Sequence, residues 1–119
     1  MADKKSDPFD NWTTQARKGF IELCVLNALL SEDKYGYDLV KILVNTPGIG
    51  VSEGTVYPLL SRLRVQGLVE TYLVESSSGP ARKYYTLTDE GRQSISKMNL
   101  YMDALYQGVN QIREDGTEE

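Results

Sequence analysis

The sequence predicts an α+β fold that is mostly helical: a winged helix-turn-helix with an N-terminal helix before it and a long C-terminal helix after it. Three observations predict this fold. Two amphipathic helical patterns flank a short break at residues 46–48, a hairpin pattern occupies residues 69–87, and a regular apolar seam runs through residues 95–112. A chain of 119 residues with 40% hydrophobic content can bury one modest core, so we expect a single domain.

The first helix is predicted from about residue 11 to residue 30, after a polar segment, residues 1–10, that we expect to be flexible. Apolarity is almost continuous from Phe20 onward, so this helix should be buried on several faces. Cys24 lies in that run and is the only cysteine of the chain, which has no histidine. We therefore expect no disulfide within one chain, no zinc site of the usual cysteine and histidine kind, and no cofactor.

A second helix should begin near Gly36 and end before residue 46, because Pro47 and Gly48 are stop signals. A third should run from Ser52, which can cap its start, to Gly67, which can close its end. Pro58 has no backbone N–H, so the third helix should be irregular near its start unless packing compensates. Its apolar side chains fall on one side at helical spacing: Val56, Leu59, Leu60 and Leu63.

The remaining surface of the third helix carries hydroxyl and guanidinium groups, from Thr55, Tyr57, Ser61, Arg62 and Arg64. Arginine can hydrogen-bond guanine edges or phosphate, and hydroxyl groups mostly hold phosphate oxygens. This pattern is typical of the recognition helix of a helix-turn-helix, which reads duplex DNA. Taken alone, it fits an ordinary core helix equally well.

Residues 69–75 and 82–87 are rich in aromatic and β-branched side chains and flank a polar tip with Gly79 and Pro80, which predicts a β-hairpin. By itself this pattern favours a plain surface hairpin. Arg82 and Lys83 lie just past the tip. Beside a recognition helix, they could contact phosphates or a neighbouring minor groove, and the hairpin would then be a wing.

The last helix is predicted over residues 88–113, with Thr88 as its cap, and is followed by an acidic tail, residues 114–119. An apolar seam recurs along it at steps of three and four: Ile95, Met98, Met102, Leu105, Val109 and Ile112. A helix of about 25 residues is about 37 Å long, more than a small domain covers easily. We therefore expect the seam to pack against a partner subunit; packing against the first helix, which carries Trp12, is the alternative.

The formal net charge of −4 counts against attraction of the whole molecule to DNA. Acidic residues concentrate after residue 86, and salt screens surface charges beyond about 8–10 Å, so an acidic rear can coexist with a DNA-binding front. No nucleophile has a histidine base and no glycine-rich phosphate loop follows a strand, so we expect no catalytic residues and no enzyme. The N-terminus lacks the apolar stretch of a secretion signal, and no segment approaches the roughly 20 apolar residues of a membrane span, so we expect a cytoplasmic protein.

Four motifs are specific in combination: Tyr35-Gly36-Tyr37-Asp38-Leu39, Gly54-Thr55-Val56-Tyr57-Pro58-Leu59-Leu60-x-Arg62-Leu63, Gly67-Leu68-Val69 and Arg82-Lys83-Tyr84-Tyr85-x-Leu87-Thr88-x-x-Gly91. Their order and spacing, over most of residues 18–92, resemble the PadR family of bacterial transcriptional regulators. The resemblance implies a winged-helix domain and a homodimer held by the first and last helices, usually acting as a repressor. Because one helix follows the wing, the chain is similar to the short subgroup, which includes multidrug-responsive repressors with a ligand space at the dimer interface.

These observations assign residues 11–87 to a winged helix DNA-binding domain and residues 88–113 to a dimerisation helix. A dimer places two recognition helices about 34 Å apart and so predicts a roughly palindromic operator. The residues expected at the DNA groove are Ser52, Thr55, Tyr57, Ser61, Arg62 and Arg64, with Tyr35, Tyr37, Lys18, Arg82 and Lys83 on the phosphates. The residues expected at the dimer interface are those of the seam and Trp12.

A small aromatic or drug-like effector could bind between the subunits and release DNA by favouring a wrongly spaced dimer. The residues expected to line this space are Trp12, Met98, Tyr101, Met102, Leu105 and Tyr106, because aromatic and methionine side chains offer adaptable apolar contacts. A different class of function stays open. The negative net charge also fits a winged-helix module that binds protein and no specific DNA.

Overall fold

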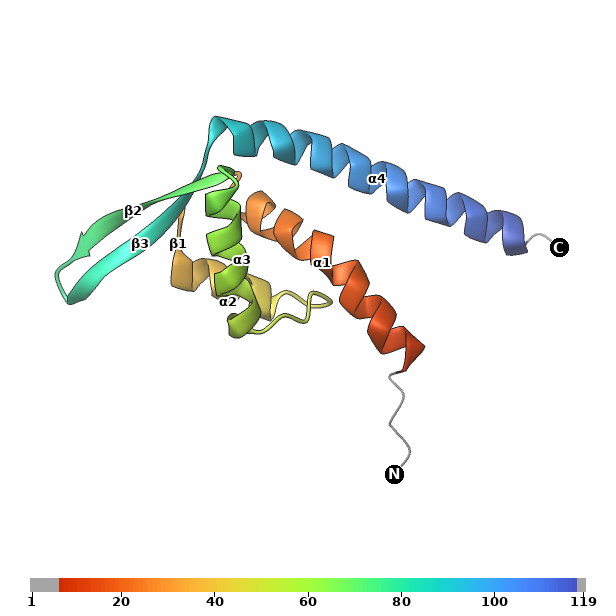
Figure 1. Cartoon of the computed structure of the whole chain (residues 1–119), viewed down its shortest axis with the longest axis horizontal. Coiled ribbons are helices and arrows are strands. Elements are labelled where there is room, and N and C mark those ends of the chain that lie inside the picture. Colours follow the sequence, from red (N-terminus) through yellow and green to blue (C-terminus); the bar gives the residue numbers. More distant parts are fainter. Residues whose placement is uncertain (1–6, 118–119) are drawn as a thin grey trace, which may run out of the picture.

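The computed structural model describes residues 7–117 and shows the predicted winged helix-turn-helix with a long C-terminal helix (Figure 1). The elements follow the order α1 (Pro8–Ala28), β1 (Lys34–Tyr35), α2 (Gly36–Asn45), α3 (Glu53–Val65), β2 (Val69–Ser76), β3 (Gly79–Leu87) and α4 (Asp89–Thr117). The three strands form one antiparallel sheet in the order β1-β3-β2. Strand β1 was not predicted, because its two residues give no periodic signal.

Helix α1 begins at Pro8, three residues before the predicted start. The carboxylate of Asp7 accepts a hydrogen bond from the backbone N–H of Phe9 at 2.9 Å, and proline is favourable in the first turn because it needs no N–H partner there. Residues 8–10 therefore belong to the helix. The flexibility predicted for residues 1–6 lies outside the described residues.

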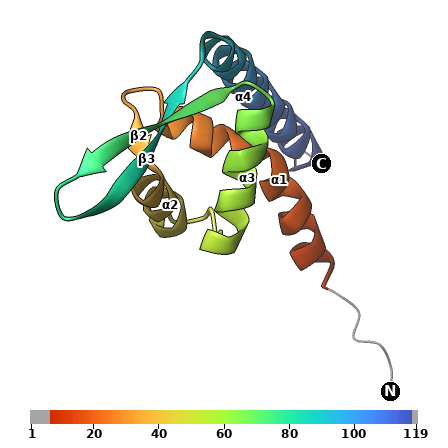
Figure 2. The same cartoon turned by 60° about the vertical axis from the view of Figure 1, so that its left-hand side comes forward.

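The core lies where α1, α2 and α3 meet the inner face of the sheet. Leu26 of α1, Leu39 of α2 and Leu60 of α3 are fully buried, and Tyr85 and Leu87 close the core from β3. Figure 2 shows α3 between α2 and α1, with the hairpin projecting to one side. The apolar side predicted for the third helix is confirmed, since its four residues are all buried.

The two ends of α3 are capped in different ways. At the C-terminal end, Gly67 adopts φ +80° and the N–H of Leu68 bonds to the carbonyl of Leu63 at 3.0 Å, as predicted for a glycine closure. At the other end the predicted side-chain cap is wrong: the Ser52 hydroxyl lies 3.2 Å from the Thr55 hydroxyl and bonds no backbone N–H. Pro58 leaves the helix unbroken, because the buried side chains around it hold the backbone in place.

Helix α4 starts with the predicted cap, since the Thr88 hydroxyl accepts a hydrogen bond from the N–H of Gly91 at 2.9 Å. It then runs to Thr117, so residues 114–117 continue the helix and are not a separate tail. Two amide hydrogen bonds between Asn27 and Asn99, at 2.9 and 3.0 Å, tie α4 to α1. The radius of gyration is 17.9 Å, whereas a compact chain of this length would have about 13.5 Å, because α4 projects well beyond the core.

Candidate nucleic-acid interface

The exposed surface of α3 has two flanks. Thr55 and Arg62 face α1, where they line a cleft between the two helices. Tyr57 and Arg64 face the wing, where both lie close enough to Tyr85 of β3 to affect its ionisation. Burial raises the pKa of the Tyr85 phenol, Tyr57 raises this pKa further, and Arg64 lowers it. All six residues predicted at the groove are exposed, so this part of the chain can meet a partner without unfolding.

The outer face of the sheet carries a row of tyrosines that the sequence analysis missed. Tyr84 is the cross-strand partner of both Tyr35 and Tyr72, with ring centroids 5.9 and 5.7 Å apart. Tyr37 continues the row at 6.2 Å from Tyr35. The rings of Tyr72 and Tyr84 are stacked, and the other two pairs are tilted. The sequence predicted phosphate contacts for Tyr35 and Tyr37 but not this cluster.

The two cations predicted on the wing point to opposite faces of β3, because successive side chains of a strand alternate. The guanidinium of Arg82 lies over the ring of Tyr35 at 5.1 Å, a cation–π contact that draws it toward the start of α2. Lys83 shares the face of Tyr85, the side on which α2 and α3 lie. Both side chains are exposed, and together they place positive charge on each face of the wing.

The wing is anchored to the segment before β1. The hydroxyl of Tyr72 donates a hydrogen bond to the carboxylate of Asp33 at 2.7 Å. Hydrogen bonding by Thr86, and then by Tyr72, lowers the pKa of Asp33, so this carboxylate remains ionised and keeps accepting at neutral pH. This hydrogen bond and the pairing of β1 with β3 connect the hairpin to the segment that leads into α2.

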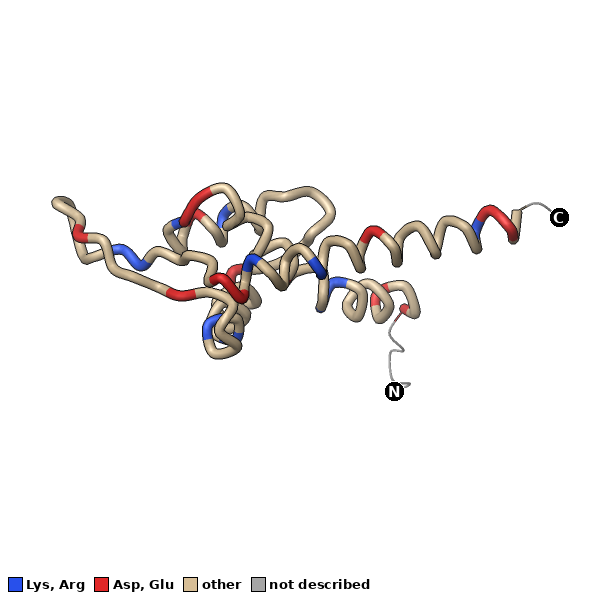
Figure 3. Tube along the Cα trace, turned by 90° about the horizontal axis from the view of Figure 1, so that it is seen from above, with Lys and Arg blue, Asp and Glu red and all other residues tan. Residues whose placement is uncertain are grey.

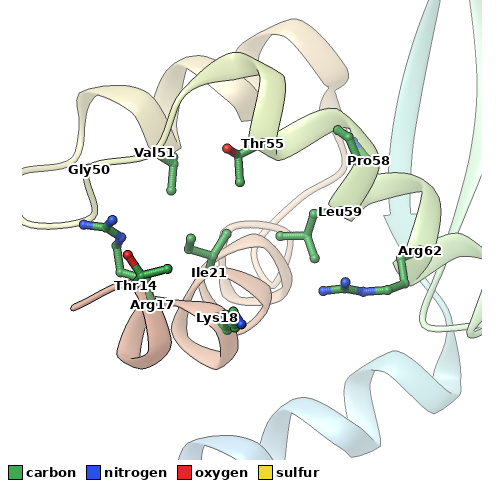
Figure 4. Close-up of a pocket in the computed structure, with 10 residues that line it drawn as sticks. All are labelled: Thr14, Arg17, Lys18, Ile21, Gly50, Val51, Thr55, Pro58, Leu59 and Arg62. Atoms are coloured by element: carbon green, nitrogen blue, oxygen red, sulfur yellow. The ribbon is translucent and has the colours of Figure 1, made fainter. Parts of the chain in front are cut away.

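A cleft of about 450 Å³ separates α3 from the N-terminal half of α1 (Figure 4). It contains the predicted phosphate contact Lys18 and two further cations, Arg17 and Arg62. Arg62 forms an ion pair with Glu22 of α1. Its guanidinium is therefore turned toward α1, and its place at the DNA groove stays a prediction. Arg17 was not predicted from the sequence, because nothing in the local pattern places it next to α3.

The predicted seam of α4 divides into two parts. Ile95 is 2% exposed, so its assignment to a dimer interface is wrong: it holds α4 onto its own chain. Met98 is only partly buried against the same core, and its place at a dimer interface stays a prediction. Leu105, Val109 and Ile112 lie beyond the core and are exposed. Helix α1 also exposes large apolar side chains, those of Phe9, Trp12 and Phe20, and its buried residues all lie after Phe20, in the predicted apolar run.

The residues predicted to line an effector space are not brought together within one chain. Trp12 lines a shallow pocket of about 260 Å³ with Phe20 and Ile49, whereas Tyr101 and Tyr106 project from the exposed part of α4. An effector space between two subunits stays a prediction.

Charge is distributed unevenly over the molecule (Figure 3). Basic positions lie on the wing and on the helices beside it, and acidic positions are spread over the same elements as well as over both ends of α4. Within residues 7–117, no helix is both long and apolar enough to cross a membrane.

The comparisons with known proteins agree with this geometry. The model of the transcriptional regulator PadR-like family matches residues 25–97. A PadR-like transcription factor from Bacteroides fragilis is 39% identical, with a TM-score of 0.71 over 86% of this chain and 98% of that one. A PadR family transcriptional regulator from Eggerthella lenta is 35% identical, with a TM-score of 0.76 over 89% of this chain and 92% of that one.

A PadR-like transcriptional regulator from Bacillus cereus is 38% identical, with a TM-score of 0.73 over 82% of this chain and 95% of its own. Regulators of this family bind DNA and are not enzymes, which confirms the expectation that the chain is no enzyme. With most of the winged helix inside the matched residues, this chain belongs to the transcriptional regulator PadR-like family.

Proposed function

We propose that this protein is a homodimeric transcriptional repressor that acts in the cytoplasm and inserts one α3 into the major groove at each half of a roughly palindromic operator. The observation that carries the proposal is the surface of α3, where exposed hydroxyl groups of Thr55, Tyr57 and Ser61 lie between two cationic flanks. Hydroxyl groups on a helix can meet base edges and phosphates, and flanking cations can hold the backbones that border the groove.

Dimerisation is proposed from the apolar surface that one chain leaves uncovered. Leu105, Val109 and Ile112 follow one another at steps of four and three on the projecting half of α4, and Trp12 is 66% exposed on α1. A second copy would cover these side chains by a two-fold contact, which buries the same surface on both subunits. In this proposal the dimerisation helix is the part of α4 beyond residue 99.

The proposal is tested by selection of random duplex DNA with the purified protein. We expect enrichment of a two-fold symmetric sequence whose half-sites are about one helical turn, or 34 Å, apart. Enrichment of a single half-site would contradict the dimer. If no sequence is enriched at moderate salt, the sequence-specific reader is wrong and a winged-helix module that binds protein becomes the better interpretation.

Lys83→Ala should weaken binding to every duplex by a similar factor, because an exposed lysine on the wing contacts phosphate and not bases. The slope of log K against log salt concentration should become shallower by about one unit, the contribution of one phosphate contact. Fluorescence anisotropy between 50 and 200 mM salt, on the selected operator and on a scrambled duplex, measures both quantities. Lys97→Ala, which removes the same charge from α4, should leave the slope unchanged. A loss confined to the operator would instead assign Lys83 to a base.

A further inference from the structure

The cleft between α1 and α3 has the composition of a site for an anion. Three cations line it, Arg17, Lys18 and Arg62, together with the hydroxyl groups of Thr14 and Thr55, and no carboxylate is among its lining residues. Among residues 7–117 the ion pairs are Arg62–Glu22 and Lys34–Glu32, so Arg17 and Lys18 have no carboxylate partner there. The charges of Arg17 and Lys18 are therefore uncompensated among the described residues, whereas Glu22 compensates that of Arg62.

The cleft also lies on the correct side of α3 for a second phosphate backbone. A helix in the major groove has one phosphate backbone on each side, and the wing lies on the side of α3 opposite to α1 (Figure 2). The α1 cleft flanks the opposite side of α3 and begins at Thr55, in the N-terminal half of α3 that reads bases in helix-turn-helix proteins. Arg17 reaches the loop before α3, where its Nη1 lies 3.5 Å from the place of a Cβ at Gly50.

We propose that this cleft binds a backbone phosphate of the operator. In the absence of DNA, Glu22 takes the place of that phosphate as the partner of Arg62. The inference rests on the proposed function, since it requires that α3 binds duplex DNA. The Glu22 side chain is only 25% exposed, whereas that of Arg62 is 57% exposed. Arg62 can therefore turn from Glu22 to an incoming phosphate, but Glu22 is then left partly desolvated without its partner. The exchange makes Glu22 an internal competitor that lowers the affinity for DNA.

The competitor is tested with Glu22→Gln, which keeps the size of the side chain and removes its charge. Since exposed ion pairs contribute about 0.2–1 kcal/mol, Glu22→Gln should bind the selected operator about threefold more tightly than the natural protein, with an unchanged salt slope. Asp103→Asn removes the same charge from α4 and should change the affinity less. Weaker binding by Glu22→Gln would overturn the proposal, because Glu22 would then be holding Arg62 in its binding position.

The phosphate site is tested with Arg17→Gln and Arg62→Gln. Each should make the salt slope shallower by about one unit and weaken operator and scrambled duplex equally. Lys97→Gln is the matched control, and circular dichroism verifies that the variants fold. If the salt slope is unchanged for both variants while Lys83→Ala still changes it, the proposed phosphate site in the cleft is wrong. The proposed DNA-binding function would not be affected by that result. Failure of the natural protein to bind any selected duplex would overturn both.

Discussion

Replacing Gly91 with alanine is expected to destabilise the fold by about 3 kcal/mol, at the upper end of the effect of overpacking. Gly91 lies in the first turn of α4, and a Cβ there would overlap the carbonyl oxygen of Leu68 and approach the carbonyl carbon to 3.1 Å. That same oxygen accepts the N–H of Thr88 at 3.1 Å. The backbone at the junction of α3, the wing and α4 would have to separate, and the bond between Thr88 and Leu68 would weaken.

Urea unfolding at a fixed protein concentration measures this effect, since a dimer makes apparent stability depend on concentration. Gly108→Ala is the matched control: it lies in the same helix, and a Cβ there meets nothing within 4 Å. The control should stabilise the protein by about 0.5–1 kcal/mol, because alanine restricts the unfolded chain. Equal effects of the two substitutions would contradict the close packing of Gly91 on Leu68.

The second large effect is expected from Leu105→Asp. Leu105 is 48% exposed in one chain and belongs to the proposed two-fold contact. A dimer would bury the new carboxylate on the apolar seam of both subunits without a cation, which is strongly unfavourable. The variant should be monomeric, and it should bind the operator about 100-fold more weakly, because both half-sites can no longer be bound together.

Sedimentation and fluorescence anisotropy measure the two parts of this prediction. Gln107→Asp introduces the same charge two residues away, on the side of α4 that faces away from the seam, and should leave dimer and affinity unchanged. Circular dichroism should be unchanged for both variants, since neither side chain belongs to the core. A dimeric Leu105→Asp variant would contradict the seam, and a monomer with full operator affinity would contradict the two half-sites.

The elements whose signals are local could be predicted from the sequence. Helical spacing in α3, the stop at residues 46–48, the Thr88 cap and the alternation in the wing each depend on neighbours a few residues away, so they could be read without coordinates. The family motifs combine those same local signals, and they led to the correct fold. The outward residues of α3 were predicted for the same reason: a buried side of a helix defines its exposed side.

Which of those residues face each other depends on the packing of distant elements and could not be predicted from the sequence. The apolar seam of α4 has one continuous helical spacing in the sequence, yet Ile95 is buried in its own core, Met98 is partly buried against it, and Leu105, Val109 and Ile112 are exposed. Arg62 looks outward by its spacing but bonds to Glu22, which lies 40 positions earlier in the chain. Such contacts depend on how helices pack in space, and periodicity within one helix carries no information about the partner on the next.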